Sequence, residues 1–189
     1  MSGKLVILSG PSGAGKSSIA KRLLQENDFN LCFSVSACSR KKREGEEHGK
    51  DYYFLSIDEF KTKIEEDEFL EWEEVYPGHY YGTLKIEVEK HRSMGRNIIF
   101  DVDVVGGINI RRQYKEDSIA IFIQPPSPEV LEQRLKARKT ETPENLEKRI
   151  RKARMEMTYA KKYDHIVTND DLNRAVKEVS GLVRDFLGL

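Results

Sequence analysis

The 189-residue sequence predicts an α/β fold, a three-layer α/β/α core around a parallel sheet, with an inserted β-rich segment. An apolar run at 4–9 precedes a glycine-rich octapeptide and an amphipathic segment, the order of strand, loop and helix. Further apolar runs at 97–101, 118–123 and 165–169 are typical of strands buried on both faces of a parallel sheet. Between these parts, residues 34–94 contain several short strand patterns.

The octapeptide GPSGAGKS, which begins at Gly10, has the pattern of a nucleotide-binding phosphate loop. Gly10, Gly13 and Gly15 allow the positive φ angles with which a backbone curls around phosphate oxygens. The N–H groups of such a loop point inward at the positive end of a helix dipole. Lys16 is expected to reach the β- and γ-phosphates of ATP or GTP, and the Ser17 hydroxyl to bind Mg²⁺. The motif and its flanks predict the core of a P-loop NTPase.

The C-terminal half carries two helix-start signals. Ser127 followed by Pro128 predicts a helix that continues to about 138, and Thr142 followed by Pro143 predicts a longer one. The longer helix has an apolar stripe formed by Leu146, Ile150, Ala153, Met157 and Ala160. A last helix is expected at 172–187, after the strand at 165–169.

The middle of the chain follows a different pattern. Short strands are expected at 32–36, 52–55, 69–75 and 80–81, and helices at 58–67 and 84–94. The polar, glycine-containing stretch at 39–50 is interpreted as a loop. These short elements predict an inserted piece that is separate from the parallel sheet.

Composition limits the classes of function. The chain has 32 Lys+Arg and 32 Asp+Glu, so its formal net charge of zero gives no support for nucleic-acid binding. No apolar run approaches the ~20 residues that cross a bilayer, and no signal peptide is recognisable. Cys32 and Cys38 lack metal-ligand spacing, so we expect reduced thiols in a cytoplasmic protein, with a disulfide as the alternative.

Several polar residues are candidates for chemistry. Asp101 ends an apolar run, where a carboxylate beside a phosphate loop can hold Mg²⁺; a surface aspartate is the alternative. Arg40, Arg43 and Tyr52 have the groups to clamp a second phosphate, although a solvated basic loop explains the spacing equally well.

Two carboxylates and three arginines complete the candidates. A carboxylate facing the N1–H and amine edge of guanine accepts hydrogen bonds from it and repels adenine, a role open to Glu71 and Asp103. Composition alone favours an exposed strand acid for Glu71. Arg134 and Arg138 share a helix face, and with Arg149 they can neutralise a phosphoryl group in transfer. For Arg149, composition alone favours an ordinary charged helix surface.

With these residues in place, the chain resembles the guanylate kinase family over essentially its whole length. The resemblance rests first on the phosphate loop, FSVS at Phe33, Arg40, Arg43, Gly45-Glu46 and GKDY ending at Tyr52. It continues with EFLEW at 68–72, YYGT at 80–83, FDVD at 100–103, PPS at 125–127, Arg134 through Arg138, and VTNDD at 167–171.

The resemblance implies a nucleoside monophosphate kinase that converts ATP and GMP to ADP and GDP with Mg²⁺, with dGMP as a further acceptor. It implies that ATP contacts Gly10, Ser12, Gly13, Ala14, Gly15, Lys16, Ser17, Ser18 and Asn169. It places Arg40, Arg43, Tyr52 and Tyr81 on the GMP phosphate, and Ser36, Glu71, Thr83 and Asp103 around the guanine. The implied catalytic residues are Lys16, Arg134, Arg138 and Arg149, and the implied metal ligands are Ser17 and Asp101.

The same resemblance divides the chain. It implies a core at about 1–33, 95–126 and 163–189, a GMP-binding insertion at about 34–94, and a helical lid at about 127–162. The implied partners are the small molecules GMP and ATP, with no nucleic acid and no membrane, in the cytoplasm. The oligomeric state stays open.

The chain departs from the family pattern at a few positions and leaves two alternatives. The departures are Cys38-Ser39 for Thr-Thr, Lys42 for Pro, a longer turn at 76–79, Val105 for Gln, and Lys139 for Gly. One alternative is another small-molecule kinase on this scaffold, for example one that acts on a ribose phosphate. The other is a catalytically inactive protein-interaction module, which the intact Lys16 and Ser17 disfavour.

Overall fold

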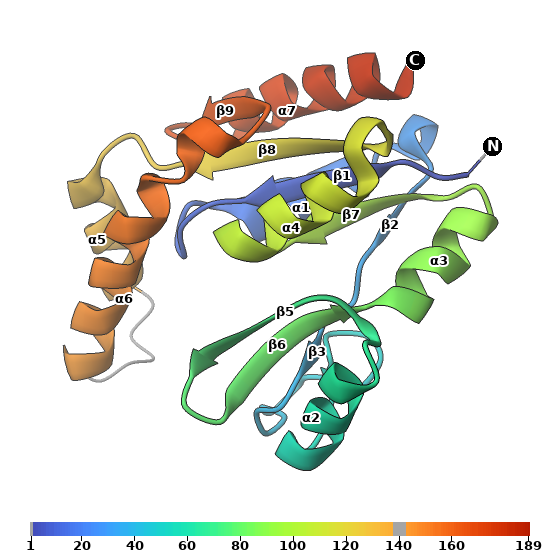
Figure 1. Ribbon diagram of the computed structural model, residues 1–189. Coiled ribbons are helices and arrows are strands. Elements are labelled where there is room, and N and C mark those ends of the chain that lie inside the picture. Colours follow the sequence, from blue (N-terminus) through green and yellow to red (C-terminus); the bar gives the residue numbers. More distant parts are fainter. Residues whose placement is uncertain (1, 138–142) are drawn as a thin grey trace.

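The computed structural model describes residues 2–137 and 143–189, which form a parallel sheet with helices on both faces and a smaller second sheet beside it (Figure 1). The larger sheet has five parallel strands in the order β2-β7-β1-β8-β9. They are β1 (Leu5–Ser9), β2 (Leu31–Phe33), β7 (Asn97–Asp101), β8 (Ser118–Gln124) and β9 (His165–Thr168). The three-layer α/β/α prediction is confirmed.

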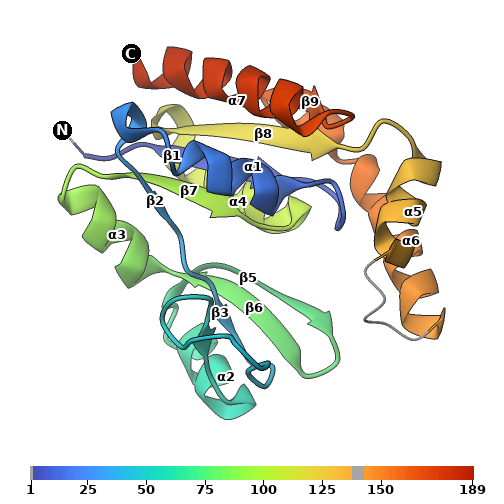
Figure 2. The same cartoon turned by 180° about the vertical axis from the view of Figure 1, so that it is seen from behind.

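Helices cover both faces of this sheet. Figure 1 shows α4 (Val104–Tyr114) in front of the sheet, and Figure 2, from behind, shows α1 (Lys16–Leu23) on the other face, with α7 (Leu172–Leu187) beside it along β8 and β9. Two apolar clusters, one on each face, fill the core. Alternate residues of β1 supply both clusters, Val6 and Leu8 to one and Leu5 and Ile7 to the other. This alternation explains why the strand is apolar throughout.

The strand order fixes where a ligand can bind. β1 lies between β7 and β8, so the chain turns to opposite sides of β1. In open parallel sheets, ligands bind at the carboxyl ends of the strands beside such a switch point. The phosphate loop follows β1, Asp101 ends β7, and Asn169 follows β9. The fold therefore gathers these predicted residues at one edge.

The second sheet has the order β4-β3-β6-β5 and packs on α2 (Ile57–Glu65). Its strands are β3 (Ala37–Cys38), β4 (Tyr53–Phe54), β5 (Phe69–Tyr76) and β6 (His79–Leu84). Its small core is aromatic: the Phe60 ring stacks on Phe69 with centroids 4.3 Å apart, and on Tyr80 at 5.5 Å. A capping box of Ser56 and Glu59 starts α2. α3 (Lys85–Ser93) leads back to the larger sheet.

Two helices, α5 (Pro128–Ala137) and α6 (Pro143–Met157), extend to one side of the larger sheet (Figures 1 and 2). Leu131, Leu135 and Ala153 pack between them, with Leu146 and Ile150 at the margin. The Ser127 hydroxyl accepts a hydrogen bond from the Val130 N–H, as the predicted N-cap requires. Short 3₁₀ helices are η1 (Asn27–Phe29), η2 (Lys115–Asp117) and η3 (Ala160–Lys162). No helix in the described ranges has the length and apolarity to cross a membrane.

Some sequence expectations were wrong. The strand expected at 32–36 ends at Phe33, and the chain starts a new strand of the other sheet at Ala37. No helix is expected from the sequence at 104–114, where Gly106 and Gly107 lower helix propensity, yet α4 forms there and Asp103 caps it. The apolar stripe continues past the end of α6 to Ala160, which lies in η3. Both cysteines are free and buried, as expected.

Candidate functional site

The phosphate loop has the backbone geometry expected from its glycines. Gly10, Gly13 and Gly15 have φ angles of 139°, 91° and 99°, which disfavour other residues. A Cβ at Gly10 would also lie 2.1 Å from the Ile123 carbonyl oxygen. Gly15 directly precedes α1, so the curled backbone opens onto the positive end of a helix. The loop can therefore hold an anion through its main chain.

Lys16, Ser17 and Asp101 meet at this loop. The Lys16 Nζ atom donates to the Gly10 carbonyl at 2.8 Å and lies 3.9 Å from Asp101 Oδ1. The Ser17 hydroxyl donates to Asp101 Oδ2. Hydroxyl and carboxylate oxygens suit Mg²⁺, which usually keeps waters and substrate phosphates as its other ligands. The described residues contain no cluster of three or more His, Cys, Asp or Glu that could hold a metal.

A cavity of about 420 Å³ lies beside the loop, lined by Gly13, Gly15, Ser18, Arg134, Asn169, Asp170, Asp171 and Leu172. The Asn169 side-chain amide donates to the Ala14 carbonyl at 2.7 Å, and Arg134 donates to the Asn169 carbonyl at 2.9 Å. α5 and the end of β9 therefore meet at the phosphate loop, with space for a flat ring system between them.

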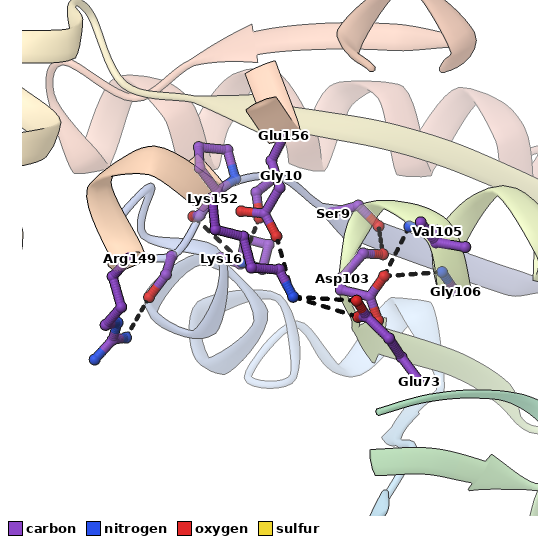
Figure 3. A network of polar contacts seen from close by, with 12 residues as sticks. Ser9, Gly10, Lys16, Glu73, Asp103, Val105, Gly106, Arg149, Lys152 and Glu156 are labelled. Carbon is purple, nitrogen blue, oxygen red and sulfur yellow. Dashed lines mark hydrogen bonds and ion pairs between the residues drawn. The ribbon is translucent and has the colours of Figure 1, made fainter. Parts of the chain in front are cut away.

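The structure describes two of the three predicted arginines, Arg134 and Arg149. Arg134 lies at this cavity, and Arg149 Nη2 donates to the Ser12 hydroxyl in the phosphate loop at 2.6 Å (Figure 3). Arg138 lies outside the described residues, as does the Lys139 departure. Both described arginines come from the α5–α6 arm and face the loop, so they can contact an anion bound there.

The second sheet holds a cationic and aromatic group. Both guanidinium Nη atoms of Arg40 donate to the Glu46 carboxylate, at 2.7 and 2.6 Å, and the guanidinium lies 4.9 Å from the Tyr52 ring centroid. The Tyr52 and Tyr81 rings meet edge to face at 6.1 Å. The Arg43 N–H also donates to Glu46 at 2.8 Å. The arrangement can clamp a small dianion such as a phosphate.

Glu71 lies in β5 of the same sheet and is buried. Its Oε1 accepts a hydrogen bond of 2.6 Å from the Thr83 hydroxyl, its partner across the β5–β6 pairing. Burial raises the pKa of Glu71 to about 7, and the charges of Asp103 and Glu73 add to the rise. A Cβ at Gly106 would lie 2.5 Å from Glu71 Oε2, so the bare backbone of α4 makes room for this carboxylate.

Asp103 faces the same region from the larger sheet. Its Oδ1 caps α4 by accepting from the Val105 and Gly106 N–H groups, at 2.7 and 3.0 Å. Ser36, also predicted at the base, lies between β2 and β3, and its carbonyl accepts from the Tyr53 N–H at 2.9 Å. The carboxylates of Glu71 in β5 and Asp103 at the start of α4 thus lie close to the same stretch of α4 backbone, and both can accept hydrogen bonds from a ligand with adjacent N–H donors.

Four polar residues belong to the site without a role assigned from the sequence: Glu46, Glu73, Lys152 and Glu156. Glu46 holds Arg40, whose guanidinium lowers the pKa of Glu46 to about 2. Glu73 lies two positions after Glu71 and so on the same face of β5. Lys152, one helical turn after Arg149, donates to Glu73 at 3.2 Å (Figure 3). Strand and helix periodicity applied to Glu71 and Arg149 could have identified the last three.

Comparison with known proteins identifies relatives over nearly the whole chain. The family model described as guanylate kinase matches residues 2–186. A guanylate kinase of Bacteroides thetaiotaomicron is 52% identical, covering 99% of this chain and 91% of that protein. A guanylate kinase of Porphyromonas gingivalis is 47% identical, covering 97% of this chain and 98% of that protein. The crystal structure of guanylate kinase from Anaplasma phagocytophilum matches with a TM-score of 0.78 and 29% identity, over 97% of this chain and 86% of that one. The chain therefore belongs to the guanylate kinase family, the nucleoside monophosphate kinases that phosphorylate GMP with ATP.

Proposed function

We propose that this chain carries out the reaction of its family with the residues gathered at the cleft, ATP at the phosphate loop and GMP at the second sheet. The observation that carries the proposal is the presence of two unlike sites, one on each sheet. One is a backbone anion cradle with Lys16, and the other is an arginine–tyrosine group in the same sheet as the buried Glu71. Phosphoryl transfer needs this positioning more than covalent catalysis.

On the donor side, the loop N–H groups of Gly10 to Ser18 bind the ATP phosphates and Lys16 neutralises the charge of the β- and γ-phosphates. The Lys16 ammonium donates to the Gly10 carbonyl and so lies at the loop. Arg134 and Arg149 approach the same loop from α5 and α6. The adenine occupies the cavity beside Asn169, and Arg138 adds a further charge.

Mg²⁺ fits the pair of oxygen donors that Ser17 and Asp101 present at the loop. These two residues would hold the ion directly or through water. When bound, Mg²⁺ neutralises phosphate charge and orients the triphosphate. Every other contact to the phosphates comes from the chain itself.

On the acceptor side, Arg40, Arg43, Tyr52 and Tyr81 bind the GMP phosphate. Ser36, Glu71, Thr83 and Asp103 surround the guanine, and the carboxylates accept from its N1–H and amine. Adenine presents an acceptor at N1, which a carboxylate repels, so this pocket selects guanine. dGMP presents the same base edge and phosphate, and we propose it as a second acceptor.

The transfer needs no general base. An anionic oxygen of the GMP phosphate attacks the γ-phosphorus of ATP, the bond from that phosphorus to the bridging oxygen breaks, and ADP leaves with the electron pair. Water is the competing nucleophile, so the residues around both phosphates must exclude it. α5 and α6 are placed to act as the lid, and the second sheet closes the other side.

A coupled assay of ADP release with GMP, dGMP, AMP, UMP and dTMP tests the proposal. GMP is expected to give the highest kcat/KM by orders of magnitude, with dGMP next. Equal use of AMP would contradict the guanine pocket. Rapid phosphorylation of a ribose phosphate would favour the alternative kinase, and no transfer to any acceptor would favour an inactive interaction module. The cytoplasmic location and the absence of a nucleic-acid partner stay predictions.

A further inference from the structure

α6 contacts two different parts of the cleft from one helix face. Arg149, Lys152 and Glu156 are spaced by three and four residues and therefore lie on the same side of the helix. Arg149 donates to Ser12 in the phosphate loop, whereas Lys152 extends away from it (Figure 3). The helix thus reaches the proposed donor site through Arg149, and Lys152 points to a different part of the molecule.

Lys152 reaches the second sheet. Its Nζ donates to both carboxylate oxygens of Glu73 in β5, at 3.2 and 3.4 Å, and joins segments 79 residues apart. The two side chains are 27% and 30% exposed, so the pair is partly withdrawn from water and less screened than a surface ion pair. This contact ties the α5–α6 arm to the insertion across the cleft.

The Lys152 ammonium also lies near a second carboxylate, that of Glu156. Its Nζ lies 4.0 Å from Glu156 Oε1, and Glu156 is only 5% exposed. Burial raises the pKa of Glu156 and of Glu73, and the charge of Asp103 raises the pKa of Glu73 further. Without the Lys152 ammonium, acids from α6, β5 and the cap of α4 would repel one another, with only Lys16 to offset part of the charge of Glu156. Their repulsion would push α6 away from the insertion.

We propose that Lys152 is a positioning residue, which through Glu73 holds α6 against the insertion so that Arg149 stays directed at the phosphate loop. The inference rests on the proposed function, since it assumes that Arg149 meets the transferring phosphate. Lys152 acts through the helix and touches neither nucleotide. The pair therefore couples the donor and acceptor sides of the cleft.

A double-mutant cycle on the full chain tests this, with Lys152→Met, Glu73→Gln and the double variant. Each single change is expected to lower kcat/KM for ATP at saturating GMP by about fivefold, which corresponds to roughly 1 kcal/mol. The double variant should be no slower than the slower single. The charge reversal Lys152→Glu with Glu73→Lys should recover part of the loss. Lys148→Met, an exposed lysine of the same helix, is the matched control and should match the parent.

Further measurements separate positioning from folding and from direct GMP binding. Thermal unfolding should be nearly unchanged in Lys152→Met, and at ~1 M salt its difference from the parent should shrink because the pair is screened. Calorimetry with GMP alone should give Lys152→Met the affinity of the parent. Losses that multiply in the double variant, or a Lys152→Met enzyme equal to the parent, would overturn the inference. A parent that phosphorylates no GMP would instead overturn the proposed function.

Discussion

The phosphate loop and the region around Glu71 are built by different means. The phosphate loop is one continuous octapeptide whose glycine φ angles shape the main chain, so the anion site that we propose there depends on few side chains. The region around Glu71 takes Glu71 and Thr83 from two strands of the second sheet and Asp103 from the N-terminal cap of α4. Main-chain N–H groups suit any phosphate, whereas a buried carboxylate suits only ligands with matching donors. In the proposed assignment, generic binding is local in sequence, and selectivity is assembled from residues far apart in the chain.

The comparison predicts the largest loss for the donor side. Lys16→Ala should lower kcat by about 1000-fold, since removing a charge aimed at a transition state typically costs ~10²–10³, while GMP binding should be unchanged. Steady-state kinetics measure the expected loss of kcat, and calorimetry with GMP alone measures the affinity for GMP. Lys21→Ala, an exposed lysine of the same helix, is the control. Near-normal turnover in Lys16→Ala would remove the phosphate loop from the chemistry.

The acceptor side should lose selectivity instead. Glu71→Gln is expected to lower kcat/KM for GMP by about 50-fold, because hydrogen bonds to a charged group contribute roughly 1.5–3 kcal/mol. The ratio of kcat/KM for GMP to kcat/KM for AMP should also fall. Glu74→Gln, on the opposite face of β5, serves as the control. If the preference for GMP over AMP survives intact, Glu71 does not face the base.

The same contrast explains what the sequence predicted well. The phosphate loop and the buried strands follow from short local patterns, and residue spacing placed Lys16, Ser17 and Asp101 together. Glu71 could not be singled out from its acidic neighbours by composition, because its burial depends on Thr83 and on the bare backbone at Gly106. α4 was missed because its glycines are poor helix formers, and packing on the sheet overrides that preference.

A smaller effect is expected for Glu46, which lies close in sequence to the arginine that it holds. Glu46 holds both Nη atoms of Arg40, so Glu46→Gln should leave the guanidinium less ordered and raise KM for GMP by about fivefold, with kcat little changed. Glu47→Gln, the exposed neighbour, is the control. A lower KM in Glu46→Gln would show that the Glu46 carboxylate competes with the GMP phosphate for Arg40.

The smallest effect concerns pH. Burial raises the pKa of Glu71 to about 7, so this carboxyl is partly protonated near neutrality. A protonated carboxyl loses acceptor capacity toward the guanine N–H groups, so GMP binding should weaken as pH falls. With a pKa of about 7, the ionised fraction drops about threefold between pH 7.5 and 6.5, and KM for GMP should rise by that factor.

The GMP phosphate itself titrates with a second pKa of about 6, so it also contributes to the pH dependence of KM. A control is therefore needed in which the ligand is the same and Glu71 does not ionise. Glu71→Gln supplies it, because its KM should keep only the shallower dependence of the phosphate. Stability follows the opposite sign: since the folded pKa lies above the unfolded value of 4.5, the native state loses stability as pH rises from about 4.5 through 7. Glu71→Gln should therefore raise the unfolding temperature relative to the parent at pH 8 but not at pH 4. If the pH profiles of KM and of unfolding temperature in Glu71→Gln coincide with those of the parent, Glu71 ionises like an exposed acid. The acceptor side would then be no more selective among ligands than the phosphate loop.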